Sequence, residues 1–171
     1  MRQLLFISSL LITLTLTGCL GVFGGKQGAK YEQLGPGLIR EVQALGNHNW
    51  IVIADESFPL HTRRGVRTLL VDQETPGVLH GVIDALKNQQ QVTPIFHRTR
   101  ELNFVENDTA PGIDFFRDAI NESLQGYEVR DFRYDYLSVI LKDESKTFAV
   151  LVIKTKTALP YSSIFIELEG N

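Results

Sequence analysis

The segment Leu45–Pro59 reads Leu-Gly-Asn-His-Asn-Trp-Ile-Val-Ile-Ala-Asp-Glu-Ser-Phe-Pro, and it decides the fold. Its centre, Trp50–Ala54, is an unbroken apolar run that is too short for a helix. Such a run predicts a strand buried on both faces, as in a parallel sheet. Gly46 suits the end of a preceding helix, because glycine adopts the left-handed conformation at little cost. The segment therefore predicts a helix that leads into a central strand of an α/β domain.

Asp55 falls where this strand should end, ahead of Pro59. In open α/β sheets ligands bind beyond the carboxyl ends of the strands, so an acidic residue at this point is a candidate for a binding or catalytic site. Aspartate also commonly caps a turn through its side chain, without any ligand. From this stretch alone both interpretations stay open.

Outward from the strand, apolar periodicity predicts alternating helices and strands. The Thr75-Pro76 pair marks a helix start, because proline at the first helical position loses no needed hydrogen bond. Pro94 indicates that its short strand lies at an edge or carries a bulge. The predicted helices are 37–45, 75–87, 113–124 and 135–142, and the further strands are 66–71, 92–96, 127–132, 148–153 and 164–168. This order predicts a single α/β domain with a largely parallel sheet and flanking helices.

The amino-terminal end has the pattern of an export signal. Arg2 precedes the apolar stretch Leu4–Leu16, and Leu16-Thr17-Gly18-Cys19 follows at once. This tetrapeptide resembles the lipobox of bacterial lipoproteins, in which the cysteine is acylated and becomes the new amino terminus. The resemblance predicts a signal peptide over 1–18, lipidation of Cys19, a glycine-rich flexible tether over 19–35, and a folded domain over 36–171.

The same resemblance predicts a place in the cell. Acyl chains on Cys19 would anchor the protein to a lipid bilayer of the bacterial cell envelope. Leu20 follows the cysteine, where lipoproteins retained in the inner membrane commonly carry aspartate. We therefore expect the outer membrane, with the domain facing the periplasm.

The composition and the motif searches narrow the function classes. With 22% charged residues and a net charge of −3, the 171-residue chain gives no reason to expect nucleic acid as a partner. The four histidines share no ligand spacing, so we expect no metal site, and no cofactor-binding motif is present. His80 and Asp84 form a solvent-facing pair on a predicted helix. The arginines at 63, 64 and 67 could meet an anion or form a solvated loop.

Two motifs resemble the D-ribose pyranase and L-fucose mutarotase family. Leu45-Gly46-Asn47, the strand that ends in Ala54-Asp55, and Phe58-Pro59 are similar to that family's Leu-Gly-His motif, apolar strand and Asp-Ala-Gly-Leu-Pro. Val152-Ile153-Lys154-Thr155, followed by Pro160-Tyr161-Ser162-Ser163-Ile164, is similar to its Ile-Arg-Thr-Gly-Glu segment and its Pro-Tyr-Ala-Asn-Ile segment. The two motifs bracket nearly the whole predicted domain.

The resemblance implies a fold and an activity. Members of this family are α/β proteins that assemble into ring-like oligomers, with pockets between neighbouring subunits. They interconvert ring forms or anomers of a free monosaccharide without a cofactor, by acid–base ring opening and closure. The resemblance therefore implies a homo-oligomer that binds a monosaccharide or a similar polyhydroxylated ligand.

Carried over by position, the resemblance also implies site residues. The family's aspartate and tyrosine fall on Asp55 and Tyr161. Its first histidine falls on Asn47, with His48 one residue along, so His48 is the one candidate proton carrier. Its asparagine falls on Ser163, and its second histidine falls near Tyr134. The expected catalytic residues are therefore Asp55, His48 and Tyr161, and the expected ligand contacts add Asn47, Ser163 and Tyr134.

Two functions follow from this pattern. In the first, a lipid-anchored relative of the sugar mutarotases binds a small polyhydroxylated ligand, with or without catalysis of ring-form or anomer exchange. In the second, the same scaffold is a non-catalytic envelope protein that acts as an oligomeric interaction module. The absent histidines favour the second function, and the retained Asp55 and Tyr161 favour the first.

Overall fold

Strand β1 (Trp50–Ala54) lies in the interior of a six-stranded sheet, and all five of its residues are buried. We describe residues 33–171 in a computed structural model of the chain. On one side β1 pairs in parallel with β5 (Val150–Lys154), and on the other side it pairs antiparallel with β6 (Ile164–Gly170). The unbroken apolar sequence of β1 is thus explained, because the strand has a neighbour on each side and a layer of helix on each face.

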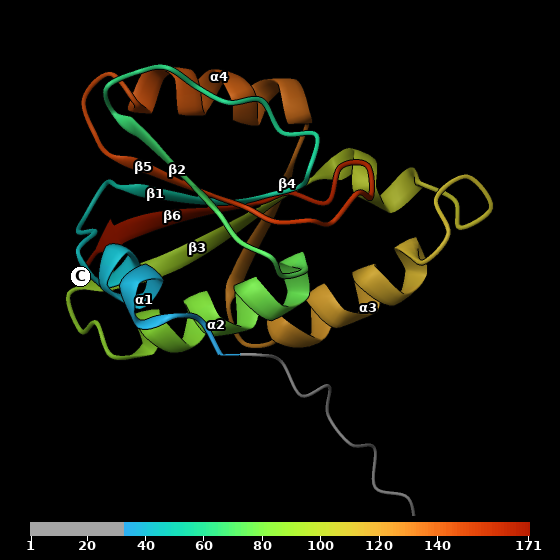
Figure 1. Cartoon of the computed structure of the whole chain (residues 1–171), viewed down its shortest axis with the longest axis horizontal. Coiled ribbons are helices and arrows are strands. Elements are labelled where there is room, and N and C mark those ends of the chain that lie inside the picture. Colours follow the sequence, from blue (N-terminus) through green and yellow to red (C-terminus); the bar gives the residue numbers. More distant parts are fainter. Residues whose placement is uncertain (1–32) are drawn as a thin grey trace, which may run out of the picture. The chain divides into compact units, whose positions relative to one another are not determined.

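The sheet has the order β2-β5-β1-β6-β3-β4 (Figure 1). The outer strands are β2 (Val66–Leu70) and β4 (Glu128–Phe132), and β3 (Val92–Thr99) lies between β6 and β4. Five strands run parallel to one another, and β6 alone among the strands of residues 33–171 is antiparallel to its neighbours. The predicted α/β fold with a largely parallel sheet is confirmed.

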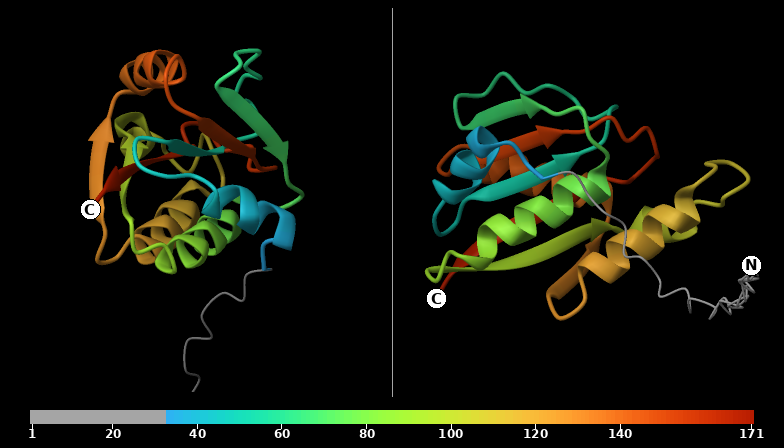
Figure 2. Two further views of the ribbon diagram at one scale, coloured as in Figure 1. Left: turned by 90° about the vertical axis from the view of Figure 1, so that its left-hand side faces the viewer. Right: turned by 60° about the horizontal axis from the view of Figure 1, so that its bottom comes forward.

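Helices cover both faces of the sheet, in unequal number. Three of them, α1 (Pro36–Gln43), α2 (Thr75–Lys87) and α3 (Ile113–Ser123), lie on one face, and α4 (Tyr134–Glu144) lies on the other (Figures 1 and 2). The side chains accordingly form two apolar cores. The larger core joins α2 and α3 to the sheet, and the smaller core packs α4 on β1 and β5.

One local expectation differs from the structure, and one element was not expected. The strand with Pro94 is not an edge strand, since β3 has neighbours on both sides. Its pairing with β4 begins only at Ile95, so Pro94 has no β4 residue opposite it and its missing N–H breaks no bond there. A short 3₁₀ helix, η1 (Arg100–Phe104), follows β3 and was not expected.

Residues 33–171 belong to one compact unit, which has two apolar cores. None of the helices within residues 33–171 is long and apolar enough to cross a membrane. The predicted signal peptide over 1–18 and the predicted lipidation site at Cys19 lie outside the described residues, as does the predicted tether up to residue 32.

Candidate functional site

The carboxyl ends of the five parallel strands meet at one edge of the sheet, and β6 begins there because it runs the other way. Asp55 follows β1 at this edge. The turn 159–163 that leads into β6 brings Tyr161 and Ser163 to the same place. Two segments that lie far apart in the sequence are therefore joined at one edge of the sheet, an arrangement that spacing alone left open.

Asp55 is 6% exposed, and neighbouring groups donate hydrogen bonds to both oxygens of its carboxylate. Its Oδ2 accepts a hydrogen bond from the hydroxyl of Ser163 at 2.6 Å. Its Oδ1 accepts from the backbone N–H of Ser57 at 2.9 Å and from the Ser57 hydroxyl at 2.5 Å. The bond to the N–H two residues on is the side-chain turn cap that aspartate commonly makes. Asp55 thus caps its loop and also lies at the edge where ligands bind in such sheets.

Tyr161 is the exposed member of the site, with 42% of its surface accessible. Its backbone carbonyl accepts a hydrogen bond from the Thr99 hydroxyl at 2.7 Å, which fixes the turn to the end of β3. Its ring packs edge-on against Tyr134 at the start of α4, with 6.3 Å between the ring centroids. Two phenol groups are therefore held side by side at the carboxyl edge.

Backbone conformation marks two of the expected site residues. Among residues 33–171 the non-glycine residues with positive φ are His48, at 63°, and Tyr161, at 58°. A side chain in this left-handed region costs on the order of 1–3 kcal/mol and persists where the surrounding structure imposes it. Such outliers gather at functional sites, and both of these residues were chosen from the sequence on other grounds.

The carboxyl edge also collects buried hydroxyl groups that the sequence reasoning did not identify. The Thr75 hydroxyl, at the start of α2, lies 3.0 Å from that of Thr155, which follows β5. The Thr155 hydroxyl also donates to the carbonyl of Ala54 at 2.9 Å, and the Thr157 hydroxyl accepts from the N–H of Thr75 at 2.8 Å. Thr155 lies inside the motif Ile153-Lys154-Thr155, so its position was visible even though its role was not.

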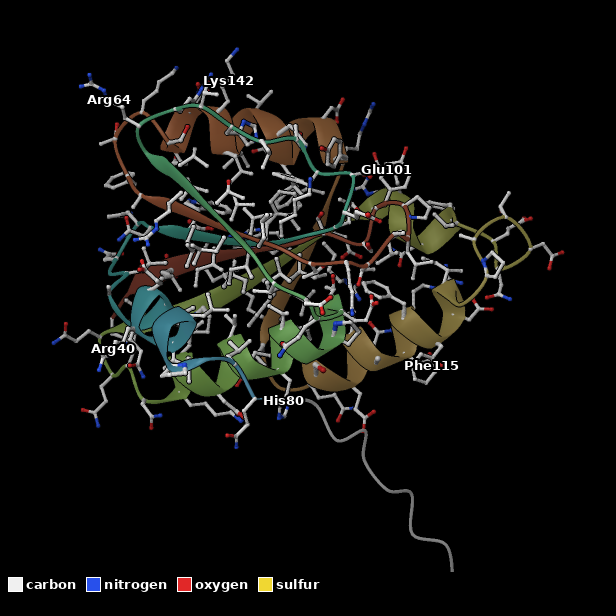
Figure 3. The ribbon with its side chains drawn as sticks, in the orientation of Figure 1. Arg40, Arg64, His80, Glu101, Phe115 and Lys142 are labelled. Carbon is white, nitrogen blue, oxygen red and sulfur yellow. The ribbon has the colours of Figure 1, made fainter. Side chains whose placement is uncertain are left out.

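Glu101 is a further acidic residue at this edge that the sequence did not reveal. It lies in η1, and its two carboxylate oxygens accept the backbone N–H of Tyr134 at 3.1 and 3.2 Å. Figure 3 places Glu101 beside the start of α4. The Glu101 carboxylate thus fixes the backbone of Tyr134, the first residue of α4, and the ring of Tyr134 contacts Tyr161.

Asn47 and His48 lie at the opposite end of β1. The five-residue strand separates them from Asp55, and at about 3.3 Å per residue the two ends are roughly 20 Å apart. The His48 ring packs on Phe148 at 5.0 Å, and the backbone N–H of His48 donates to the carbonyl of Leu168. The structure therefore brings Asp55, Ser163, Tyr161 and Tyr134 together, and it does not bring Asn47 or His48 to them within one chain.

His97 is the buried histidine of the described residues, at 2% exposed. Its ring is stacked between Trp50 and Phe132, and its Nε2 lies 3.1 Å from the Glu167 carboxylate. Burial lowers its pKa, which the carboxylate of Glu167 offsets only in part. No group of three or more histidine, cysteine or acidic side chains within residues 33–171 is arranged to hold a metal ion.

The fold and the site together define a class of protein. Its members are α/β proteins with a mostly parallel sheet, in which one antiparallel strand lies between two groups of parallel strands and an aspartate and a tyrosine lie at the carboxyl edge. The family follows from the sequence. The pattern of the RbsD / FucU transport protein family matches residues 29–168, and this chain belongs to that family. No functionally curated protein matches the chain.

Solved structures share the fold at low sequence identity. RbsD of Bacillus subtilis, solved with D-ribose, is 18% identical with a TM-score of 0.55, over 83% of this chain and 97% of that one. FucU of Bifidobacterium longum is 13% identical with a TM-score of 0.55, over 81% and 96%. The fucose mutarotase of Streptococcus pneumoniae, solved with L-fucose, is 17% identical with a TM-score of 0.52, over 80% and 94%. The likeness covers nearly the whole length of each relative.

Proposed function

We propose that this chain is a sugar-binding, mutarotase-like protein whose ligand site is the carboxyl edge around Asp55 and Tyr161. The observation that carries the proposal is the convergence of these two residues, with Ser163 hydrogen-bonded to the Asp55 carboxylate. Two solved relatives of the same fold were captured with D-ribose and with L-fucose. A monosaccharide is therefore the ligand class to test first.

The side chains at the edge suit a small polyhydroxylated molecule. The exposed Tyr161 phenol can donate to a sugar hydroxyl or lie beside the sugar ring, and Tyr134 offers a second phenol next to it. Asp55 accepts hydrogen bonds, and a sugar hydroxyl would reach it by replacing the hydroxyl of Ser57 or Ser163. If catalysis occurs, Asp55 is the group at this edge that removes a proton while the ring opens.

His48 and Asn47 enter this proposal only through a second copy of the chain. Both lie at the other end of β1, so neither reaches Asp55 of its own chain. In an oligomer with pockets between subunits, the His48 of one copy would face the carboxyl edge of the next and carry the second proton. The proposal therefore includes a homo-oligomer.

The anchor forms a separate part of the proposal. We infer from the lipobox-like Leu16-Thr17-Gly18-Cys19 that Cys19 is acylated and holds the domain on the envelope, at the outer membrane facing the periplasm. Expression of the full chain in a bacterium and detergent phase partition would test it. The parent protein is expected in the detergent phase, and Cys19→Ser in the aqueous phase. A parent protein found in the aqueous phase would refute the anchor.

A saturation-transfer NMR experiment on a soluble form that lacks residues 1–19 tests the sugar site. We expect ribose, fucose or another sugar of a panel to bind, and Tyr161→Phe to weaken binding about fivefold, the loss of one hydrogen bond of about 1 kcal/mol. Tyr136→Phe is the matched control, because Tyr136 is an exposed tyrosine of α4. Faster anomer exchange that Asp55→Asn abolishes would establish an enzyme. No binding of any sugar would refute the proposed site.

A non-catalytic role has one observation in its favour. The Asp55 carboxylate is buried and already accepts hydrogen bonds at both oxygens, as a purely structural aspartate would. In that case the domain is an oligomeric interaction module of the envelope. Light scattering would then show an oligomer, while the sugar panel gives neither binding nor exchange.

A further inference from the structure

A small cavity lies between α4 and the strands β2 and β5, on the face of the sheet that α1, α2 and α3 do not cover. Its volume is about 150 Å³. The floor is aliphatic and consists of Val66, Leu141, Val150 and Val152. A water molecule occupies about 30 Å³ of the liquid and a methylene takes a similar volume, so the cavity has room for about five carbon atoms.

The mouth of this cavity is cationic. The charged residues that line it are Arg63 and Lys142, with His61 beside them, and no acidic residue lines it. The Arg63 guanidinium donates to the carbonyl of Lys142 at 2.5 Å and lies 3.4 Å from the Ser145 hydroxyl, so two contacts hold it at the rim. A fixed guanidinium loses little side-chain freedom when it binds an anion.

A wider hollow of about 730 Å³ adjoins the cavity and shares Arg63 and Ser145 with it. Arg64, Arg67 and Lys146 also line this hollow. Figure 3 shows Arg64 and Lys142 standing out from the molecule at the same end. These cations gather on one surface of a chain whose net charge is −3, so this local positive charge differs in sign from the charge of the whole chain.

Some of these charges are neutralised and others are not. Arg67 pairs with Glu41 at 2.7 Å, and Lys146 pairs with Asp143 at 2.7 Å. In the part of the chain that the structure describes, no carboxylate forms an ion pair with Arg63, Arg64 or Lys142. The Asp143 carboxylate, which pairs with Lys146, also lies within electrostatic reach of Arg63 and Lys142, but it does not line the cavity. The mouth therefore keeps a net positive charge.

We propose that this cavity is a second ligand site, which takes an aliphatic monocarboxylate of about five carbons. The chain of the ligand lies on the floor of valines and Leu141, and its carboxylate lies at Arg63 and Lys142. A free sugar suits the site less well, because the floor is mainly aliphatic and the hydroxyl of Ser138, which also lines the cavity, already donates to the carbonyl of Tyr134. Inorganic phosphate could meet the cations but would leave the floor empty.

A titration of residues 31–171 with a series of carboxylates, followed by amide NMR shifts, tests the proposal. From acetate to pentanoate we expect the affinity to rise about fourfold for each added methylene, because burying one methylene contributes about 0.8 kcal/mol. The rise should stop beyond about five carbons, where the cavity is full. The largest shifts should fall on Leu141, Val150 and Val152.

Charge variants separate the mouth from the floor. Arg63→Gln should weaken pentanoate about tenfold or more, since a hydrogen bond to a charged group contributes about 1.5–3 kcal/mol. Because Arg63 also holds the end of α4, Lys142→Gln supplies a second rim variant at an exposed position. The matched control is Arg40→Gln, which removes an exposed arginine of α1 on the opposite face and should leave binding unchanged.

Pentanol binding as tightly as pentanoate would overturn the proposed carboxylate. Equal affinity for acetate and pentanoate would overturn the role of the floor, and would leave a surface that attracts any anion. Absence of shifts around the cavity with every member of the series would overturn the site. Each of these outcomes is independent of whether a sugar binds at Asp55, because the two sites are tested with different ligands.

Discussion

Asp55 and Ser163 hold each other by two reciprocal hydrogen bonds across 108 positions of the sequence. The backbone N–H of Asp55 donates to the Ser163 hydroxyl oxygen at 3.0 Å, and that hydroxyl donates to the Asp55 carboxylate at 2.6 Å. The end of β1 is thereby fastened to the start of β6. The geometry of the candidate site is thus set by the pairing of these two strands.

Ser163→Ala should lower the free energy of unfolding by about 1–3 kcal/mol, because the Asp55 N–H and one carboxylate oxygen would lose their buried partner. Urea unfolding of the two proteins measures the change. Ser123→Ala is the control, since its hydroxyl bonds only a carbonyl of its own helix, and it should change stability by less than about 0.5 kcal/mol. Equal effects of the two substitutions would contradict the importance of the reciprocal pair.

The positive φ of His48 predicts an unusual order of stabilities. His48→Gly should be more stable than His48→Ala by about 1 kcal/mol, because glycine adopts φ 63° without the steric cost that alanine retains. Thermal or urea unfolding of both variants gives the comparison directly. Each variant loses the same contact with Phe148, so this loss cancels between them. If the alanine variant were the more stable, residue 48 would not hold a left-handed backbone.

Glu101 should matter for the start of α4. Glu101→Ala removes the acceptors of the Tyr134 N–H and should destabilise the protein by about 1 kcal/mol, the usual value of a helix cap. Glu101→Gln keeps one acceptor oxygen and should lose less. Hydrogen exchange at the Tyr134 amide would localise the effect to the first turn. Unchanged exchange in Glu101→Ala would show that the contact contributes nothing in solution.

His97 makes stability depend on pH. Burial lowers its pKa below the ordinary 6.5, so the unfolded chain binds the proton more readily than the folded chain. This contribution is fully present above pH 6.5, and stability is lost as the pH falls below 6.5 toward the lowered folded-state pKa. His97→Phe, which keeps an aromatic ring beside Trp50 and Phe132, should flatten the dependence between pH 7 and 5. Urea unfolding at several pH values measures it, and an unchanged slope in the variant would assign the effect elsewhere.

Local sequence patterns predicted much of the fold. The unbroken run Trp50–Ala54 predicted its strand to the residue, and Thr75-Pro76 predicted the start of α2. These predictions succeed because burial on both faces and the missing N–H of proline act on neighbouring residues. The shared position of Asp55 and Tyr161 was implied by the family resemblance and could not be worked out from spacing.

Other features depend on contacts between distant segments. His97-Arg98-Thr99 extend β3 beyond the predicted strand because β6 and β4 pair with them, although their side chains are polar. The direction of β6 likewise follows from pairing and not from its own sequence. Glu101 was missed because its partner, the N–H of Tyr134, is 33 residues away. No local pattern encodes such a bond.

The antiparallel strand β6 has a consequence for how the molecule is made. It lies between the group β2-β5-β1 and the pair β3-β4, and it is the last strand in chain order of residues 33–171. During translation, the edges of β1 and β3 that pair with β6 stay unpaired until Ile164–Gly170 have left the ribosome. Unpaired strand edges invite association with other chains, so a chaperone that shields the nascent protein would act most usefully until β6 has been made.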